Sequence, residues 1–279
     1  MSGRGSKSRA THSLDRRERW RNGQVMTTEH FISPHGRQLA YRRCAPARSN
    51  LTYVWLCGFK SDITGSKVMC LEQWAKDEGH GFLAFDYSGH GESGGAFEDG
   101  TISQWREDAL DAIDALTDGP LVLVGSSMGG WMALLSGLAR RKRLAGMVLI
   151  APAPDFTQKL MWPEFTPRQQ EEIMEHGLTL RPSDYGDPYP ITKALIEDGR
   201  DWQLLDAPIE LDCPVRILQG AEDPDVPWRH AFRLVEAMIS ADLVFTLIKD
   251  GDHRLSRDQD IARLLATCGE IAGIPKMPG

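Results

Sequence analysis

Residues 121–131 read LVLVGSSMGGW, and this run decides which fold the chain can adopt. The apolar residues Leu121–Val124 are typical of a buried strand. They lead directly into Gly125-Ser126-Ser127-Met128-Gly129, and Trp131–Arg140 beyond has the pattern of a helix. A serine between two glycines at a strand–turn–helix junction is typical of a nucleophile carried on a sharp turn.

The two glycines of this motif have a steric explanation. In so sharp a turn, side chains two positions before and after the serine would collide, and Gly125 and Gly129 have none. Ser127 is then exposed at the carboxyl end of its strand, where open α/β sheets bind ligands. The N–H of Met128 would lie at the start of the helix, where developing negative charge is favoured. A glycine-rich turn with an incidental serine is the alternative interpretation.

Strand-like and helix-like segments alternate on both sides of this motif. Such alternation predicts an α/β fold with a mainly parallel sheet and helices on both faces. A turn at Pro34-His35-Gly36 predicts that the first two strands form a hairpin, and Thr101–Gln104 fits a capping box at the start of a helix. The predicted strands are residues 29–33, 38–42, 51–56, 82–87, 121–124, 147–150, 215–218 and 243–248, and further helices are predicted at 66–78, beyond Pro227 and beyond Ser256.

The alternation breaks at residues 153–207, which contain six prolines and many aromatic residues. At about 55 residues, the segment is far longer than an ordinary loop. We interpret it as a helical insertion that covers the site as a cap. The predicted domains are therefore an α/β core at 27–152 and 208–275, the cap at 153–207, and a basic tail at 1–26.

Composition excludes several classes of protein. The chain of 279 residues is 41% hydrophobic and 25% charged, as in ordinary globular domains, and it is long enough for a sizeable core. Its net charge of −7 argues against nucleic-acid binding, and no apolar run is long enough to predict a membrane span. The five cysteines are scattered without a CxxC pair, which fits a reducing compartment and argues against a zinc or redox site. We expect no metal and no organic cofactor.

Residues 1–23 differ from the rest, with seven basic residues against two acidic ones and almost no apolar residues. Such a segment cannot bury enough surface to fold alone, so we expect a disordered tail or translation from a start upstream of Met26. It lacks the apolar stretch of a secretory signal. It is rich in arginine and serine like a mitochondrial transit peptide, but its apolar face is poor. We therefore expect a cytoplasmic protein.

A serine nucleophile needs a base, and the base needs an orienting acid. In this fold the expected chain order is serine, acid, histidine, with both partners on loops after late strands. Among eight histidines, only His253 follows a late strand and precedes the final helix, so we expect it to be the base. An isolated surface histidine is the alternative. Glu222, Asp223 and Asp225 follow the strand at 215–218, and we expect Asp223 to be the acid, with Asp225 as the second choice.

Acyl-transfer sites of this kind also use two backbone N–H groups to bind an oxyanion. We expect the N–H of Met128 to be one of them. The other should follow the strand at residues 51–56, where the chain reads Cys57-Gly58-Phe59-Lys60. Because Gly58 lets the chain turn and a substrate oxygen approach, we expect the N–H of Phe59 to be the second donor.

Together these motifs resemble the α/β-hydrolase superfamily over residues 27–272. The run FDYSGHGES at residues 85–93 is similar to the strand-end motif F-D-x-x-G-x-G-x-S of that superfamily. Several runs are also similar to a mitochondrial group of acyl-glucuronide esterases and palmitoyl-protein thioesterases: FDYSGHGESGG at 85–95, DGPLVLVGSSMGGW at 118–131, LDCPVRILQG at 211–220, DVPW at 225–228 and DHR at 252–254.

The resemblance implies that Ser127, Asp223 and His253 form a catalytic triad. It implies hydrolysis of a carboxylic ester or acyl-thioester through an acyl-enzyme intermediate. Many superfamily members have histidine where this chain has Cys57, and Lys60 places a charge beside the predicted oxyanion donor. These two departures bear on the choice of substrate.

The fold alone does not fix the reaction. Peptidase, carbon–carbon hydrolase and haloperoxidase-like chemistry would use the same triad, and a non-catalytic small-ligand-binding module is a further alternative. We expect a small-molecule or acylated substrate, and the sequence sets no oligomeric state. The cap residues expected to line an acyl-chain pocket, unless they only pack, are Phe156, Leu160, Met161, Trp162 and Phe165.

Overall fold

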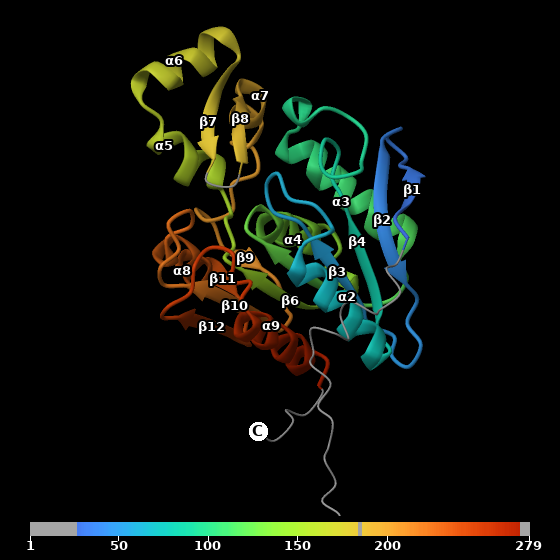
Figure 1. Cartoon of the computed structure of the whole chain (residues 1–279). Helices are drawn as coiled ribbons and strands as arrows, with labels where there is room; N and C mark the ends of the chain where they lie inside the picture. Colours follow the sequence, from blue (N-terminus) through green and yellow to red (C-terminus); the bar gives the residue numbers. More distant parts are fainter. Residues whose placement is uncertain (1–26, 184–185, 274–279) are drawn as a thin grey trace, which may run out of the picture.

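The computed structural model describes residues 27–183 and 186–273, and its centre is an eight-stranded sheet (Figure 1). The predicted basic tail at residues 1–26 lies outside the described residues. Across the sheet the strands follow the order β1-β2-β4-β3-β5-β6-β10-β12. Their bounds are β1 Glu29–Ile32, β2 Gln38–Cys44, β3 Thr52–Leu56, β4 Gly81–Phe85, β5 Leu121–Ser126, β6 Leu144–Ile150, β10 Val215–Gly220 and β12 Leu243–Ile248.

The sheet is mainly parallel, as the alternation of strands and helices predicted. β1 pairs antiparallel with β2, and β2 pairs antiparallel with β4. The other neighbouring strands are parallel. Because parallel strands end at the same edge, the loops after β3, β5, β10 and β12 all begin there.

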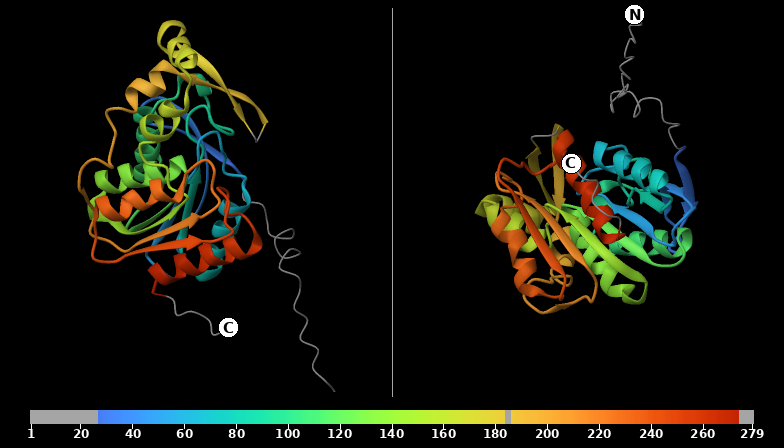
Figure 2. Two further views of the ribbon diagram at one scale, coloured as in Figure 1. Left: turned by 90° about the vertical axis from the view of Figure 1, so that its left-hand side faces the viewer. Right: turned by 90° about the horizontal axis from the view of Figure 1, so that it is seen from below.

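Helices cover both faces of the sheet (Figure 2), which explains why every residue of β3 and β4 is buried. On one face, α4 (Met128–Ala139) contacts β3, β5 and β6, and α8 (Trp228–Ala237) contacts β10 and β12. α3 (Ile102–Leu116) packs beside α4. On the other face, α2 (Ser66–Glu78) contacts β4, and α9 (Asp258–Ile271) contacts β6 and α2.

Details at the helix ends refine the sequence prediction. α4 begins at Met128 rather than at Trp131, because the chain enters the helix directly after Ser127. Thr101 caps α3, since its side chain accepts the N–H of Gln104 at 3.2 Å.

Within the described part of the chain, no helix combines the length and apolarity needed to cross a membrane. The short elements are η1 Phe97–Asp99, η2 Arg141–Arg143, β9 Ile209–Glu210 and β11 Met238–Ile239.

Residues 153–207 contain the predicted helices and also a β-hairpin that the sequence analysis did not predict (Figure 1). The helical pieces are η3 (Thr157–Met161), α5 (Trp162–Glu164), α6 (Pro167–His176) and α7 (Lys193–Asp198). The hairpin pairs β7 (Leu178–Ser183) with β8 (Gly186–Thr192). Pro188 and Pro190 in β8 concealed the strand, since proline is tolerated only on sheet edges, and both strands here are edges. The division into core and cap stays a prediction.

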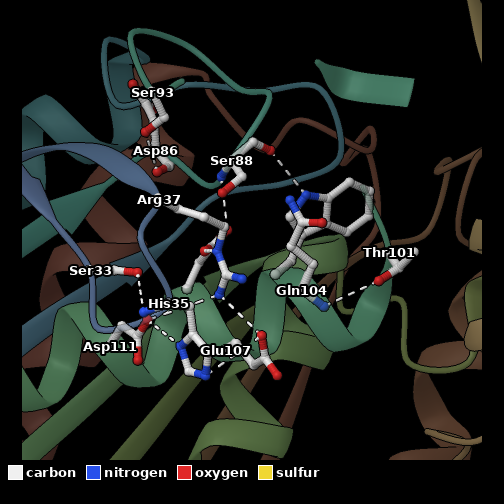
Figure 3. Close-up of polar contacts among 12 residues, drawn as sticks. Ser33, His35, Arg37, Asp86, Ser88, Ser93, Thr101, Gln104, Glu107 and Asp111 are labelled. Carbon is white, nitrogen blue, oxygen red and sulfur yellow. Dashed lines mark hydrogen bonds and ion pairs between the residues drawn. The ribbon is translucent and has the colours of Figure 1, made fainter. Parts of the chain in front are cut away.

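A group of charged residues fixes the β1–β2 hairpin to α3 (Figure 3). Arg37 donates to Asp108 at 2.6 Å and to Glu107 at 3.1 Å. Nδ1 of His35 lies 2.7 Å from Asp111, and this carboxylate raises the pKa of His35. The hairpin therefore rests on the same helix that, through Asp108, contacts the loop after β4.

The two glycines around Ser127 generate a stability prediction. A Cβ on Gly125 would overlap the carbonyl of Gly129, so we expect Gly125→Ala to destabilise the fold by at least about 1–3 kcal/mol. In a chain of this size, this corresponds to a loss of roughly 2–4 °C in Tm per kcal/mol. The matched control is Gly94→Ala, whose Cβ would meet nothing closer than 3.6 Å. Equal melting temperatures for the two variants in calorimetry would contradict this packing argument.

A buried histidine in the loop after β4 generates a pH prediction. His90 is 3% exposed, and burial lowers its pKa from 6.5 to about 4. Between these values the unfolded chain binds a proton that the folded protein does not, so stability falls as the pH falls from 6.5 towards 4. Urea titrations measure the free energy of unfolding of the wild type and of His90→Gln. The amount by which the wild-type value exceeds that of the variant should fall by on the order of 2 kcal/mol between pH 7 and 4.5. If this difference stayed constant over the pH range, His90 would not be the source of the pH dependence.

Candidate active site

Ser127 lies at the junction of β5 and α4 in an unusual backbone conformation. Its φ of 56° and ψ of −120° are rare for a residue other than glycine. Its N–H donates to the C=O of Ile150 at 2.9 Å, and its C=O accepts the N–H groups of Gly130 and Ala153 at 2.8 and 3.1 Å. These bonds to α4 and to the end of β6 hold the serine in a defined position.

His253 and Asp223 lie next to Ser127 at this edge of the sheet. The Oγ of Ser127 is 3.1 Å from Nε2 of His253, and Nδ1 of His253 is 2.8 Å from Oδ2 of Asp223. The two loops begin side by side because β10 and β12 are parallel neighbours. The structure thus brings together the three residues that the sequence analysis selected.

The surroundings of Asp223 orient the imidazole. Its carboxylate is fully buried, and Oδ1 accepts the backbone N–H groups of Asp225 and Val226 at 2.9 and 2.8 Å. Gln219 donates to Oδ2 at 3.0 Å. With the carboxylate fixed in this way, the imidazole donates through Nδ1 and can accept the serine proton on Nε2. Of the other two candidate acids, Glu222 is exposed, and Asp225 contributes its N–H to this arrangement.

The two predicted oxyanion donors lie in the segments next to the serine. Met128 opens α4, and N–H groups in the first turn of a helix have no acceptor within the helix. Phe59 lies in the turn after β3, and its N–H has no acceptor in the described ranges. A Cβ on Gly58 would lie 3.5 Å from the Cβ of Ser127, so this turn passes close beside the serine. Both N–H groups are therefore free to bind a substrate oxygen.

A pocket of about 760 Å³ contains the serine and the imidazole in its wall. Of the five cap residues selected from the sequence, Phe156, Leu160 and Met161 line this pocket. Trp162 and Phe165 do not line it, which corrects the sequence expectation. Their rings pack against each other instead, with centroids 6.3 Å apart.

Cationic side chains line the same pocket. Lys67 of α2 donates to the C=O of Arg254, and burial lowers the pKa of Lys67 to about 8. Nζ of Lys60 lies 5.5 Å from the ring centroids of Phe97 and of Tyr189. The sequence analysis did not select Lys67, because only the packing of α2 against the loop after β12 brings it here.

Asp223, Asp225 and His253 are the one group among the described residues whose ligand atoms, all within 4.8 Å of one another, could hold a metal ion. Oδ2 of Asp223 and Nδ1 of His253 already bind each other, and Oδ1 accepts two N–H groups. Hydrogen bonding therefore accounts for this cluster without a metal.

Two contacts near the site escaped the sequence analysis. The sequence analysis gave Gln219 no role, yet its side chain donates to Asp223. His90 belongs to the motif at residues 85–93, which the sequence analysis used only as a sign of the family resemblance, yet its Nε2 accepts the N–H of Lys60 at 3.1 Å. The motif was the available signal for His90, but nothing in it identified the partner.

Comparisons with known proteins agree with this architecture. Residues 58–267 match the model of the alpha/beta hydrolase family. "Palmitoyl-protein thioesterase ABHD10, mitochondrial" from Bos taurus is 35% identical over 250 residues, which cover 88% of this chain and 80% of that protein. The structure of alpha/beta hydrolase domain-containing protein 10 from mouse has a TM-score of 0.81 at 31% identity, and the match covers 88% of this chain and 98% of that one. The crystal structure titled "Putative hydrolase from Agrobacterium vitis S4" has a TM-score of 0.85 at 44% identity, and the match covers 89% of this chain and 99% of that one.

The matched region includes Phe59, Ser127, Asp223 and His253. The printed name of the Bos taurus relative includes "mitochondrial", whereas a cytoplasmic location of this chain stays a prediction from its sequence. The sheet order, the strand–turn–helix junction at Ser127 and the long family match all agree. The chain therefore belongs to the alpha/beta hydrolase family and is a hydrolase.

Proposed function

We propose that the chain is a serine hydrolase that cleaves carboxylic esters or acyl-thioesters through an acyl-enzyme intermediate. The observation that carries this proposal is the row of short contacts from Oγ of Ser127 through His253 to the buried carboxylate of Asp223. The names of relatives that are 33–35% identical, "palmitoyl-protein thioesterase", support an acyl bond as the bond cleaved.

In the first half of the reaction, Oγ of Ser127 attacks the acyl carbon while Nε2 of His253 takes the hydroxyl proton. The N–H groups of Met128 and Phe59 bind the oxyanion, a contribution usually worth about 10²–10³ in rate per donor. Asp223 stabilises the imidazolium that forms. His253 then gives its proton to the leaving alkoxide or thiolate, and the acyl group remains on the serine.

In the second half, His253 removes a proton from a water molecule that attacks the acyl-enzyme. The same two N–H groups bind the second oxyanion, and the collapse of this intermediate releases the acid and regenerates the Ser127 hydroxyl. Phe156, Leu160 and Met161 offer apolar surface to the acyl chain. Each buried CH₂ group of that chain contributes about 0.8 kcal/mol to binding.

Cys57 also lies in the pocket wall, where its thiol is an alternative nucleophile to be considered. Burial raises the pKa of its thiol, which points its proton toward the C=O of Phe85 at 3.9 Å. Because the thiolate is the reactive form of cysteine, this environment makes Cys57 unreactive. Peptidase, carbon–carbon hydrolase and haloperoxidase-like chemistry, and a binding module without catalysis, remain as outcomes that a substrate panel and serine labelling distinguish.

The first test is Ser127→Ala. We expect it to reduce turnover of p-nitrophenyl butyrate and of an acyl-thioester by about 10⁴-fold or more, because the variant lacks the hydroxyl that His253 contacts and that forms the acyl-enzyme. A fluorophosphonate probe should add one adduct to the wild type and none to the variant, measured by intact mass. The matched control is Ser136→Ala in α4, whose buried hydroxyl has no partner within the described residues. Labelling of the Ser127→Ala protein would contradict the proposal.

The second test separates the two candidate acids. Asp223→Asn places an N–H₂ donor or a weaker acceptor against Nδ1 of His253 and favours the wrong tautomer, so kcat should fall by about 10³–10⁴-fold. Asp225→Asn keeps its backbone N–H bond to Asp223 and should cost far less. Steady-state kinetics of both variants decide the assignment. An equal or larger loss in Asp225→Asn would make Asp225 the acid.

A further inference from the structure

The turn that carries the Phe59 N–H has a strained residue at its third position. The N–H of Ser61 donates to the C=O of Gly58 at 3.1 Å and closes the turn over Phe59 and Lys60. Lys60 has a φ of 54°, which the third position of a type II turn requires and which glycine usually supplies. A lysine is strained in this conformation, so another contact must hold it there.

His90 supplies that contact. Its Nε2 lies 3.1 Å from the backbone N of Lys60, and its Nδ1 lies 3.2 Å from the C=O of Ser88. A backbone N–H only donates and a C=O only accepts, so the two contacts together require a neutral imidazole with its proton on Nδ1. A protonated ring would turn a second N–H against the Lys60 N–H.

The surroundings of His90 favour this neutral state. The ring centroids of Tyr87, Phe97 and Trp105 lie 5.7, 5.2 and 5.2 Å from that of the imidazole. Burial among these rings lowers the pKa of His90 to about 4, and the Lys60 ammonium also opposes protonation. The imidazole is thus a fixed hydrogen-bond acceptor at neutral pH.

α3 in turn fixes the carbonyl that binds Nδ1. The N–H of Ser88 donates to the buried carboxylate of Asp108 at 2.9 Å, and its C=O also accepts the indole N–H of Trp105 at 3.2 Å. Arg37 of the hairpin pairs with the same side chain, so Asp108 binds both Arg37 and Ser88. These contacts form a continuous path from the hairpin to the N–H of Lys60.

We propose that His90 is a positioning residue, which holds the Phe59–Lys60 peptide so that the Phe59 N–H faces the substrate oxygen. This inference rests on the proposed function, since it assigns Phe59 to the oxyanion site. Without an acceptor, the turn relaxes toward the negative φ that lysine prefers, and the Phe59 N–H is no longer held beside Ser127. The oxyanion develops only in the transition state, so the loss falls on kcat rather than on KM.

The experiment compares two amide variants of the full chain. In His90→Gln, the amide oxygen reaches the position of Nε2 and can still accept the Lys60 N–H. In His90→Asn, the amide can donate to Ser88 but is too short to reach Lys60. Both variants lose the ring contacts, so their melting temperatures should fall by similar amounts. On p-nitrophenyl butyrate, we expect kcat of His90→Asn to fall about 10²-fold with little change in KM, and kcat of His90→Gln to stay within about 5-fold of wild type.

A second substitution tests the mechanism of that loss. Glycine adopts positive φ without support, so Lys60→Gly in the His90→Asn background should recover about 10-fold or more in kcat. Lys60→Ala in the same background removes the same charge but keeps the strain, and it should recover nothing. Equal recovery by both substitutions, or equal kcat loss in His90→Gln and His90→Asn, would reduce His90 to a packing role and overturn the inference.

The wild-type protein offers a measurement that no folding defect can obscure. Nitrogen NMR of labelled histidine at neutral pH should show His90 protonated on Nδ1 and bare on Nε2, and the opposite tautomer would overturn the inference. Failure of the proposed function is separate: it would appear as wild-type turnover that does not depend on Ser127. Turnover that depends on Ser127 together with a fully active His90→Asn would reject only the role of His90.

Discussion

The architecture depends on one steric constraint, the sharp reversal at Ser127 between β5 and α4. The serine keeps a φ of 56° only because neighbouring backbone holds its N–H and its C=O. That arrangement needs α4 to lie directly against β3, where a Cβ on Gly129 would overlap the carbonyl of Leu56. The close approach also places the end of β3, and so the turn that carries Phe59, next to the serine. The close contact at Gly129 thereby sets how near the candidate nucleophile lies to the turn that carries Phe59.

The parallel sheet brings together residues that are far apart in the sequence. Asp223 and His253 are far from Ser127 in the chain, yet each lies just after a strand that ends at the same edge. Because β6, β10 and β12 are neighbours in register, the loops after β10 and β12 extend from adjacent positions. The positions of the candidate acid and base follow from strand order. The fine adjustment comes from local bonds, such as the two N–H groups that clamp Oδ1 of Asp223.

The difference between strand order and local hydrogen bonds explains how much of the structure could be predicted from the sequence. Strand-end positions are visible in the chain, so the sheet, the serine junction and the candidate base and acid were all predictable. The β7–β8 hairpin was not, because prolines interrupt its strand pattern. Trp162 and Phe165 were misplaced, since composition cannot show that two aromatic rings pack on each other rather than into a pocket. Contacts such as Gln219 to Asp223 and His90 to Lys60 join side chains to partners that only the three-dimensional packing selects.

Two histidines in this protein show how the environment separates the roles of one side chain. His253 has a carboxylate oxygen 2.8 Å from Nδ1, and a carboxylate in that position stabilises the imidazolium that proton transfer creates. His90 has a carbonyl in the corresponding position and a ring of aromatic side chains around it. A carbonyl orients the ring without supplying the charge that would stabilise the imidazolium, and burial penalises that charge. The first imidazole is therefore suited to the proposed proton transfer, whereas the second is suited to remain a neutral hydrogen-bond acceptor.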